Sequence, residues 1–339
     1  MSFEPGALHK TTPHLFADLV ELLLLTNAYG RTGYHKNEIG DVAERLPIAA
    51  EDLDLPPLRA RAEENGAEVL DRQERYVEDL WRILEYRAAV MGAAYPFRVA
   101  RGRIDFDDPL DTPEKRLYRL LLACSRLRSF PNNGCRQRWA AAFTSLCSVA
   151  FRSMVPAHAT VRIFDANSVD RQSYYGVNLR DALQVLGNDL RPTYVNAENC
   201  AADATSGDAG LDLVAVVPFS DGAATVHAMF AQCGAQEIEW PSKVLEAHPI
   251  AFSSYFQFLH PPANVVFIPL SYRKSDGHWV NVNRVSGCVM IDRERIFHLV
   301  AHQDAEAIVN EQWFAAFETE FAAVTTPEPA QAAQSAQAA

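Results

Sequence analysis

The spacing of apolar residues predicts helices through the first third of the chain. From Pro13 to Ala28, leucines recur at helical spacing and form one broad apolar face. Residues 57–91 are rich in charge and carry an apolar stripe of the same period. Residues 111–127 begin with Asp-Thr-Pro-Glu, which is typical of a helix start. We therefore expect an all-helical module over residues 1–128.

The pattern changes after the turn-rich segment SFPNNG at residues 129–134. A helix is expected over about 136–154, and short β runs then alternate with helices. This alternation predicts an α/β or α+β domain over residues 129–324. The last residues, 325–339, hold no aromatic or large aliphatic side chain, so we expect a disordered tail there. The expected strands are 161–164, 211–219, 225–233 and 264–270, and further helices are expected over 178–186 and from Pro241.

Length, composition and net charge indicate which classes of protein the chain can belong to. A chain of 339 residues is long enough for two domains with a sizeable core. No apolar run reaches the ~18 residues that a membrane helix requires, and the N-terminal residues lack a signal-peptide pattern. Six well-separated cysteines without a Cys-x-x-Cys pair suggest reduced thiols and a cytoplasmic protein. The net charge of −12 argues against binding of nucleic acid by bulk charge.

Residues 207–249 contain the candidate chemistry. Asp212 opens a strand whose next residues, 213–217, are all apolar, and a carboxylate there is costly unless it is paired or binds a metal ion. Gln232 ends the following apolar run, 228–231. A turn over 221–223 would place Asp212 directly opposite Gln232 on the same face of a hairpin. A two-residue turn at 221–222 would instead place the two side chains on opposite faces. We expect the first register.

Lys243 supplies a nearby cation. Pro241 at a helix start would put Lys243 in the first helical turn, from which its ammonium can reach back to the strand ends. An acid, an amide oxygen and a lysine suit phosphodiester hydrolysis. The acid and neighbouring carbonyl groups can bind Mg²⁺, and the lysine can position the attacking water and offset the charge of the transition state.

The sequence resembles a known superfamily at these residues. Gly-Asp-x-Gly-x-Asp, a hydrophobic strand, a turn, a second strand ending in Gln and then a Lys resemble the restriction-endonuclease-like PD-(D/E)xK nucleases, in particular their Gln-variant branch. The similarity extends more weakly from a helix near Phe143 to residues 288–300. In the usual motif the lysine lies two residues after the Gln, where this chain has Gly234, and a glutamate follows the helix Phe, where this chain has Thr144.

The resemblance implies a fold, a cofactor and a function. The fold is a restriction-endonuclease-like mixed sheet flanked by helices. The metal is Mg²⁺ (or Mn²⁺), bound by Asp212 and Gln232, and Lys243 is the catalytic lysine. The activity is that of a DNA endonuclease in bacterial anti-phage defence or restriction. A homodimer or an ATPase or other defence subunit is the expected partner, and no membrane is involved.

A group of arginines near residue 130 is the densest basic segment of the acidic chain. It is a candidate for phosphate contacts, and ion pairs with the acidic helical module are an equal alternative. The arginines are Arg126, Arg128, Arg136 and Arg138.

Other polar residues have simpler interpretations. Asp208 fits a turn former better than a metal ligand. Asp292, Arg293 and Arg295 fit a helix cap, and His278 with Trp279 fit a hairpin tip as well as a substrate contact.

Two other functions stay open. One is a catalytically inactive nuclease-like scaffold or sensor. The other is a cysteine hydrolase that pairs Cys233 or Cys288 with His227 or His278, although no nucleophile motif accompanies these residues.

Overall fold

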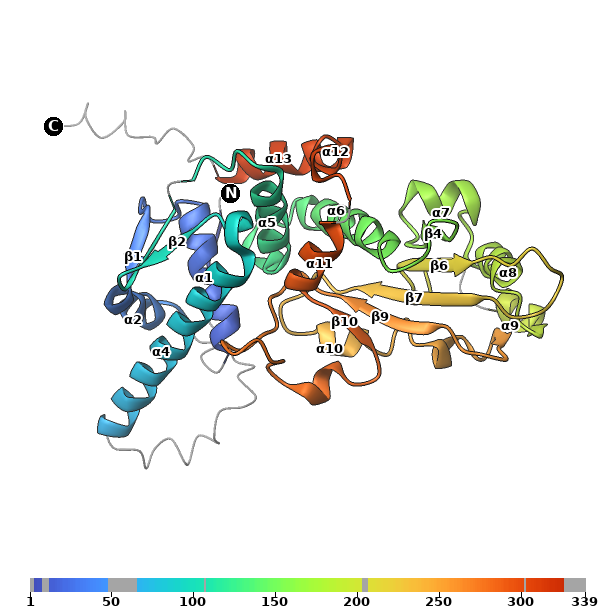
Figure 1. Ribbon diagram of the computed structural model, residues 1–339, viewed down its shortest axis with the longest axis horizontal. Coiled ribbons are helices and arrows are strands. Elements are labelled where there is room, and N and C mark those ends of the chain that lie inside the picture. The colour runs from blue at the N-terminus through green and yellow to red at the C-terminus, as the bar shows by residue number, and fades with distance from the viewer. Residues whose placement is uncertain are drawn as a thin grey trace. The chain divides into compact units, whose positions relative to one another are not determined.

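The computed structural model describes residues 3–7, 12–47, 66–106, 108–202, 207–301 and 303–325. Two compact units divide the chain (Figure 1). The first contains residues 1–139, 273–278 and 309–339, and the second contains 140–272 and 279–308. The expected boundary at 128/129 therefore differs from the observed division, and the segment from 309 onward joins the first unit. The expected disordered tail lies outside the described residues, except for Thr325.

The first unit combines helices with a small antiparallel sheet, so the expectation of an all-helical module is wrong. The strands have only three residues each, which is too short to show a clear periodicity in the sequence. The sheet has the order β1-β3-β2, with β1 (Gly33–His35), β2 (Arg98–Ala100) and β3 (Arg103–Asp105). The helices are α1 (Pro13–Leu25), α2 (Lys36–Arg45), α4 (Gly66–Met91), α5 (Pro113–Cys124) and α13 (Gln312–Thr325), with short 3₁₀ turns η1 (Gly92–Ala94) and η2 (Leu127–Ser129).

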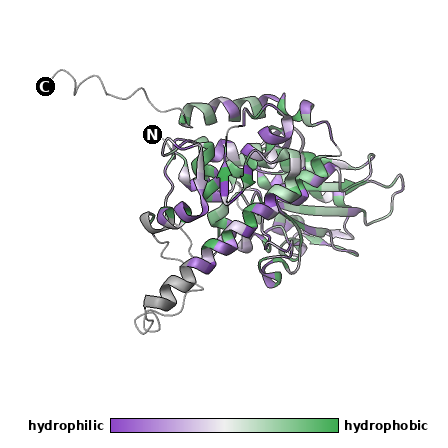
Figure 2. Cartoon of the chain, turned by 60° about the vertical axis from the view of Figure 1, so that its left-hand side comes forward, coloured by the Kyte–Doolittle hydropathy of each residue, from purple (hydrophilic) through white to green (hydrophobic). Residues whose placement is uncertain are grey.

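Sequence patterns account for the helices of this unit. All residues of α1 after Pro13 are buried, in agreement with its broad apolar face. Along the coloured part of α4, polar and apolar residues follow one another (Figure 2). Their helical spacing is the amphipathic pattern of the sequence. The Thr112 hydroxyl accepts the N–H of Lys115 and caps α5 as expected.

A buried ionic network crosslinks the helices of the first unit. Arg87 of α4 is fully buried, and its Nη1 lies 2.8 Å from Glu21 Oε1 of α1. Asp18 Oδ1 lies 2.7 Å from the same nitrogen. The hydroxyls of Tyr95 and Tyr118 donate to Glu21 at 2.9 and 2.8 Å. Because each buried charge is paired, the network can lie inside an apolar core.

The second unit is built on a mixed five-stranded sheet, which confirms the expected α/β class. Its order is β10-β9-β7-β6-β4. The strands β4, β6 and β7 are antiparallel neighbours, whereas β9 is parallel to β7 and β10 is parallel to β9. The strands are largely hydrophobic (Figure 2). Their bounds are β4 (Thr160–Ile163), β6 (Leu213–Val217), β7 (His227–Cys233), β9 (Ala263–Phe267) and β10 (Val289–Ile291).

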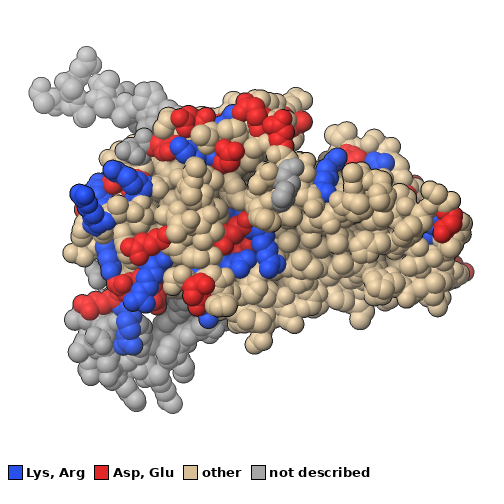
Figure 3. All heavy atoms as spheres, in the orientation of Figure 1, with Lys and Arg blue, Asp and Glu red and all other residues tan. Residues whose placement is uncertain are grey.

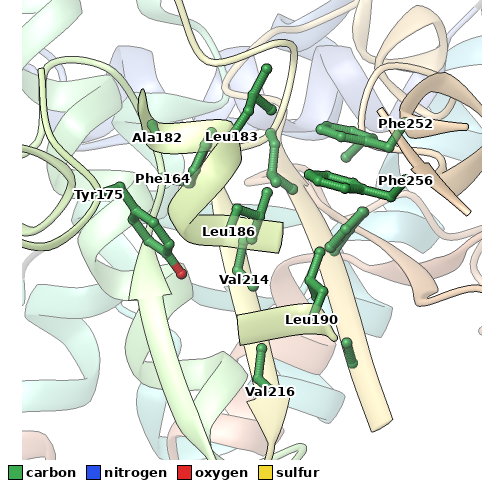
Figure 4. Packing of buried hydrophobic residues seen from close by; sticks show 14 of the residues in the cluster. Phe164, Tyr175, Ala182, Leu183, Leu186, Leu190, Val214, Val216, Phe252 and Phe256 are labelled. Carbon is green, nitrogen blue, oxygen red and sulfur yellow. The ribbon is translucent and has the colours of Figure 1, made fainter. Parts of the chain in front are cut away.

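Helices pack on both faces of the sheet, because successive side chains of each strand point to opposite faces. Val214, Val216 and Phe230 belong to a buried cluster with Leu183 and Leu186 of α8 (Figure 4). Residues of opposite parity face α6, where the rings of Phe151 and Phe267 lie 5.8 Å apart. The helices, of which α6 begins and α12 ends with residues of the first unit, are α6 (Cys135–Arg152), α7 (Val169–Tyr174), α8 (Leu179–Leu190), α9 (Ala197–Ala202), α10 (Trp240–Lys243), α11 (Arg293–Val300) and α12 (Ala305–Val309).

A second, two-stranded sheet pairs β5 (Tyr194–Val195) with β8 (Phe256–Gln257). Two 3₁₀ turns complete the unit, η3 (Pro249–Phe252) and η4 (Val282–Val285). In the described part of the chain, no helix has both the length and the apolarity to span a bilayer.

We expect Glu21→Ala to destabilise the first unit strongly, because it leaves Arg87 buried without its main counter-charge. The expected loss is about 3–5 kcal/mol of unfolding free energy, measured by urea denaturation. The matched control is Glu74→Ala at an exposed position of α4, which should change stability by less than about 0.5 kcal/mol. Equal stability of the two variants would contradict this role of the network.

Candidate functional site

The hairpin register brings the two predicted oxygen ligands together. Leu213 pairs with Ala231, so the next residues outward, Asp212 and Gln232, lie opposite each other. This register was expected from the sequence and is confirmed. The connection is longer than expected, because the ladder ends at Val217 and the loop covers residues 218–226.

Main-chain and side-chain hydrogen bonds fix Asp212 between its neighbouring strands. Its N–H donates to the Ala231 carbonyl at 3.1 Å, and its carbonyl accepts the N–H of Phe164 at 2.6 Å. The residue is only 8% exposed. Its Oδ2 accepts the N–H of Cys233 at 2.7 Å. The carboxylate therefore has one strong main-chain donor in an otherwise apolar setting.

Burial raises the pKa of Asp212 to about 7, although the Cys233 N–H lowers it. The carboxylates of Asp208 and Asp165 raise this pKa further, and the Lys243 ammonium lowers it. These effects require that the charged groups lie within electrostatic range of one another. Asp212, Asp165, Asp208 and Lys243 thus form one electrostatic cluster in the second unit.

The loop 207–212 holds this cluster through its backbone conformation. Gly207 and Gly210 have φ values of +99° and +79°, which favour glycine. The Asp208 carboxylate accepts the N–H of Gly210 at 2.9 Å, in agreement with its interpretation as a turn former. A Cβ on Gly210 would lie 2.9 Å from Glu246 Cβ, so the loop packs directly against that residue.

An ion pair with Glu246 holds Lys243 beside this loop. Its Nζ is 2.7 Å from Glu246 Oε2, and its side chain is 24% exposed. The helix α10 is short, and Lys243 is its last residue rather than part of its first turn. Glu246 packs against Gly210, and the Lys243 ammonium lowers the pKa of Asp212.

Packing around Gly234 leaves no room for a long side chain two residues after Gln232. A Cβ on Gly234 would lie 3.2 Å from Trp240 Cβ and 3.7 Å from Ile268. Trp240 is itself only 2% exposed and contacts the ring of Tyr272 at 4.8 Å. A long side chain at residue 234 would displace this aromatic packing.

Two buried amides lie on the same sheet face as Asp212. Gln232 is 6% exposed and Asn264 is 7% exposed. Among the described residues, neither Gln232 Oε1 nor Asn264 Oδ1 has a hydrogen-bond partner. Asn264 Nδ2 donates to the carbonyls of Val244 and Gly287 at 2.8 and 3.1 Å. Asn264 thereby positions the segment that follows Lys243, and each unsatisfied oxygen calls for a donor or a cation.

The sequence analysis missed Arg171, which organises the site. Its guanidinium is fully buried and donates to the carbonyls of Phe164 and Gly207 at 2.9 and 3.3 Å. Burial lowers the pKa of Arg171, and Asp208 and Asp165 raise it. Arg171 therefore joins the end of β4 to the loop 207–212 and offsets its negative charge. The six-residue helix that carries it has no sequence pattern that distinguishes Arg171 from a solvated residue.

The predicted phosphate-contact arginines form internal contacts of the first unit. Arg126 is 1% exposed and donates to the carbonyls of Pro5 and Ala7, so its assignment to a phosphate contact is wrong. Arg128 donates to the same Ala7 carbonyl, and Arg136 donates to two carbonyls of residues 128 and 130. Arg138 pairs with Glu320 of α13, and its side chain is 55% exposed. Arg138 therefore forms an ion pair, although its partner lies outside residues 1–128, where the ion-pair alternative expected it.

The remaining candidates have structural roles. Asp292 caps α11 by accepting the N–H of Arg295 at 3.2 Å, as expected. The guanidinium of Arg295 lies 4.9 Å from the Trp279 ring centre. His278 belongs to the turn 273–278 of the first unit, where its carbonyl accepts the N–H of Lys274.

The geometry also disfavours a cysteine hydrolase. Burial raises the pKa of Cys233 well above its ordinary value and that of Cys288 to about 11. A thiol with a raised pKa is a poor nucleophile. His227 and Cys233 lie at opposite ends of β7, about 20 Å apart along the strand.

Comparisons with protein-family models, with curated proteins and with solved structures found no match to this chain. In the described part of the chain, no group of three or more His, Cys, Asp and Glu side chains is arranged to bind a metal ion. Any function must therefore be argued from the cluster around Asp212 itself.

We expect Asp212→Asn to stabilise the metal-free protein, increasingly so as the pH rises. A carboxyl group with a pKa raised from 3.8 to about 7 stabilises the fold below pH 4 and loses that contribution as the pH rises through 7. The total loss is about 4 kcal/mol, and the gap between variant and wild type should widen by about 2.6 kcal/mol between pH 5 and pH 8. Urea denaturation in EDTA measures it.

Asp221→Asn is the control for this experiment, because Asp221 lies in the exposed 218–226 loop. The difference in unfolding free energy between Asp221→Asn and wild type should stay constant over the same pH range. A gap for Asp212→Asn that stayed constant with pH would show that the carboxyl group is not destabilised by burial.

Proposed function

We propose that the second unit is a metal-dependent nuclease domain that hydrolyses phosphodiester bonds of DNA. The observation that carries the proposal is the cluster at one end of the hairpin. It combines a buried carboxylate, a buried amide oxygen without a partner and a lysine whose charge acts on the carboxylate. A structural role alone does not explain why an aspartate with so costly a charge stands there.

The donor groups fit Mg²⁺ or Mn²⁺. Mg²⁺ commonly uses one or two carboxylates and keeps several waters and a substrate phosphate as its other ligands. Asp212 and the unsatisfied Oε1 of Gln232 would bind it, which would also satisfy that buried oxygen. Bound there, the ion would polarise a phosphate oxygen and lower the pKa of a coordinated water.

The chain's own residues would orient the substrate and stabilise charge. Lys243 would offset the negative charge that develops on the phosphate, and Glu246 would hold its ammonium in place. The Cys233 N–H would fix the orientation of the Asp212 carboxylate. Arg171 would act as a positioning residue, because it holds the loop 207–212 against the end of β4.

The arrangement of strands supports a restriction-endonuclease-like fold. The helix α6 precedes an antiparallel meander of β4, β6 and β7, and β9 then adds in parallel to β7. Gln232 lies at the carboxyl end of β7, and ligands of sheets with parallel strands usually bind beyond carboxyl ends. The Thr144 hydroxyl of α6 interacts with the Cys233 thiol, next to the proposed site.

Delivery of DNA would depend on a second subunit. The surface over the second unit's strands is mostly uncharged on the face drawn in Figure 3, and the chain carries a net charge of −12. A protein with this net negative charge needs a region of positive charge to bind phosphate groups. We therefore propose that the protein acts in the cytoplasm as a homodimer or with an ATPase or other defence subunit that supplies basic surface.

We expect Asp212→Ala to reduce Mg²⁺-dependent cleavage more than about 100-fold, because it removes the buried carboxylate that would bind the metal ion. Lys243→Ala should have an effect of similar direction. Purified protein is incubated with plasmid, linear DNA and RNA, with Mg²⁺ or with EDTA. The exposed Asp221→Ala and Arg180→Ala serve as charge-matched controls and should cleave like wild type. Full activity of Asp212→Ala would refute the assignment.

The second candidate function is a catalytically inactive scaffold or sensor. It is favoured by Gly234 at the usual lysine position and by the pairing of Lys243 with Glu246. Calorimetric titration with Mn²⁺ distinguishes the two functions. A nuclease should bind Mn²⁺ in a manner that requires Asp212, whereas a scaffold should show no such binding.

We expect Gln232→Glu to bind Mn²⁺ more tightly than wild type in the same titration, because it adds a carboxylate to the site. The expected gain is about tenfold in affinity, equivalent to ~1.4 kcal/mol. Gln232→Leu, which removes the amide oxygen, should bind more weakly than wild type. Unchanged affinity in both variants would exclude residue 232 as a ligand.

A further inference from the structure

An aromatic hollow lies beside the proposed nuclease site, within the second unit. Its volume is about 770 Å³, which is in the range of small-molecule sites. Four aromatic residues, Tyr194, Tyr255, Phe256 and Phe258, are among the residues that line it. Tyr194 is 59% exposed and comes from β5, whereas Phe256 is buried on the paired strand β8. Figure 4 shows Phe256 beside Phe252 at the edge of the apolar cluster.

The polar groups of the hollow define the chemistry of its ligand. Of the described residues that line it, none is Asp, Glu, Lys or Arg, so it is suited neither to a phosphate nor to a cation. Asn264, which is 7% exposed, is among the lining residues. Because Asn264 Nδ2 is committed to two main-chain carbonyls, the amide orientation is fixed, and an N–H donor that reached Asn264 from the hollow would satisfy its buried, unpartnered Oδ1. The hollow therefore favours a neutral, planar group that bears an N–H.

The same segment of chain connects the hollow to the nuclease site. Lys243 belongs to that site, and His248 and Ile250 line the hollow. His248 lies five positions after Lys243, which limits their Cα separation to about 18 Å. Asn264 also donates to the carbonyl of Val244. A nucleic acid whose phosphate lay at Lys243 would therefore have neighbouring nucleotides within reach of the hollow.

We propose that the hollow binds an unstacked nucleobase of the substrate strand. The aromatic rings would stack on the base, as in other single-strand sites, and Asn264 Oδ1 would accept a base N–H. This inference rests on the proposed nuclease function for the origin of the base. Its binding chemistry is independent of the metal and of Asp212.

Free nucleosides test the inference, because they carry a base and no phosphate. Ligand-observed NMR titrations use the full chain in EDTA with adenosine, cytidine, guanosine and thymidine. At least one nucleoside should bind saturably. Tyr194→Ala should weaken its binding at least about fivefold, since a stacking ring is lost. The control Phe219→Ala removes a ring that is 49% exposed and lies in the 218–226 loop, outside the hollow, and should bind as wild type does.

The accepting role of Asn264 is tested by changing the ligand instead of the protein. N6,N6-dimethyladenosine lacks the amino N–H of adenosine and should bind at least about fivefold more weakly. Failure of all four nucleosides to bind, or equal effects of Tyr194→Ala and Phe219→Ala, would overturn the inference. So would equal affinity for the two adenosines.

The variant Asp212→Ala separates this inference from the proposed function. It should bind nucleosides as wild type does, because Asp212 does not line the hollow. Nucleoside binding without DNA cleavage by the wild-type protein would refute the nuclease alone. Cleavage without nucleoside binding would refute the base pocket alone.

Discussion

The burial of one carboxylate determines the arrangement of the second unit's candidate site. Asp212 stands at the end of a strand that is apolar on both faces, and it is 8% exposed. Ionisation at that position is opposed by desolvation, which raises the pKa of Asp212 to about 7. A fold retains such a group only if neighbouring groups compensate for its charge. The Cys233 N–H and the Lys243 ammonium are the compensating groups that the structure provides.

The loop before Asp212 follows from the same constraint. Glycine at residue 210 permits a left-handed backbone and a contact with Glu246 that no larger residue could make. That contact places Glu246 where it pairs with Lys243. Arg171 fixes the other side of the loop through the carbonyl of Gly207. The Lys243 ammonium is therefore held by Glu246, which packs against the loop 207–212. No direct ion pair with Asp212 is needed to hold it.

The sequence predicted those features that depend on local alternation. The all-apolar run 213–217 predicted a buried strand, and the parity of the hairpin placed Asp212 opposite Gln232. Features that depend on distant contacts were not predictable. Arg126 lies in a basic segment, and only the fold shows that main-chain carbonyls of residues 5 and 7 bury it. Likewise, a buried Arg171 has the same local sequence signal as a solvated one.

Packing closes residue 234 to a long side chain. Trp240 fills the space where a side chain at 234 would project, and Gly234 is the residue that leaves that space open. Trp240 also begins the short helix that ends at Lys243. Trp240 therefore both excludes a long side chain at residue 234 and begins the helix that ends at Lys243. Residues 234 and 243 are thus related by packing and not by sequence spacing.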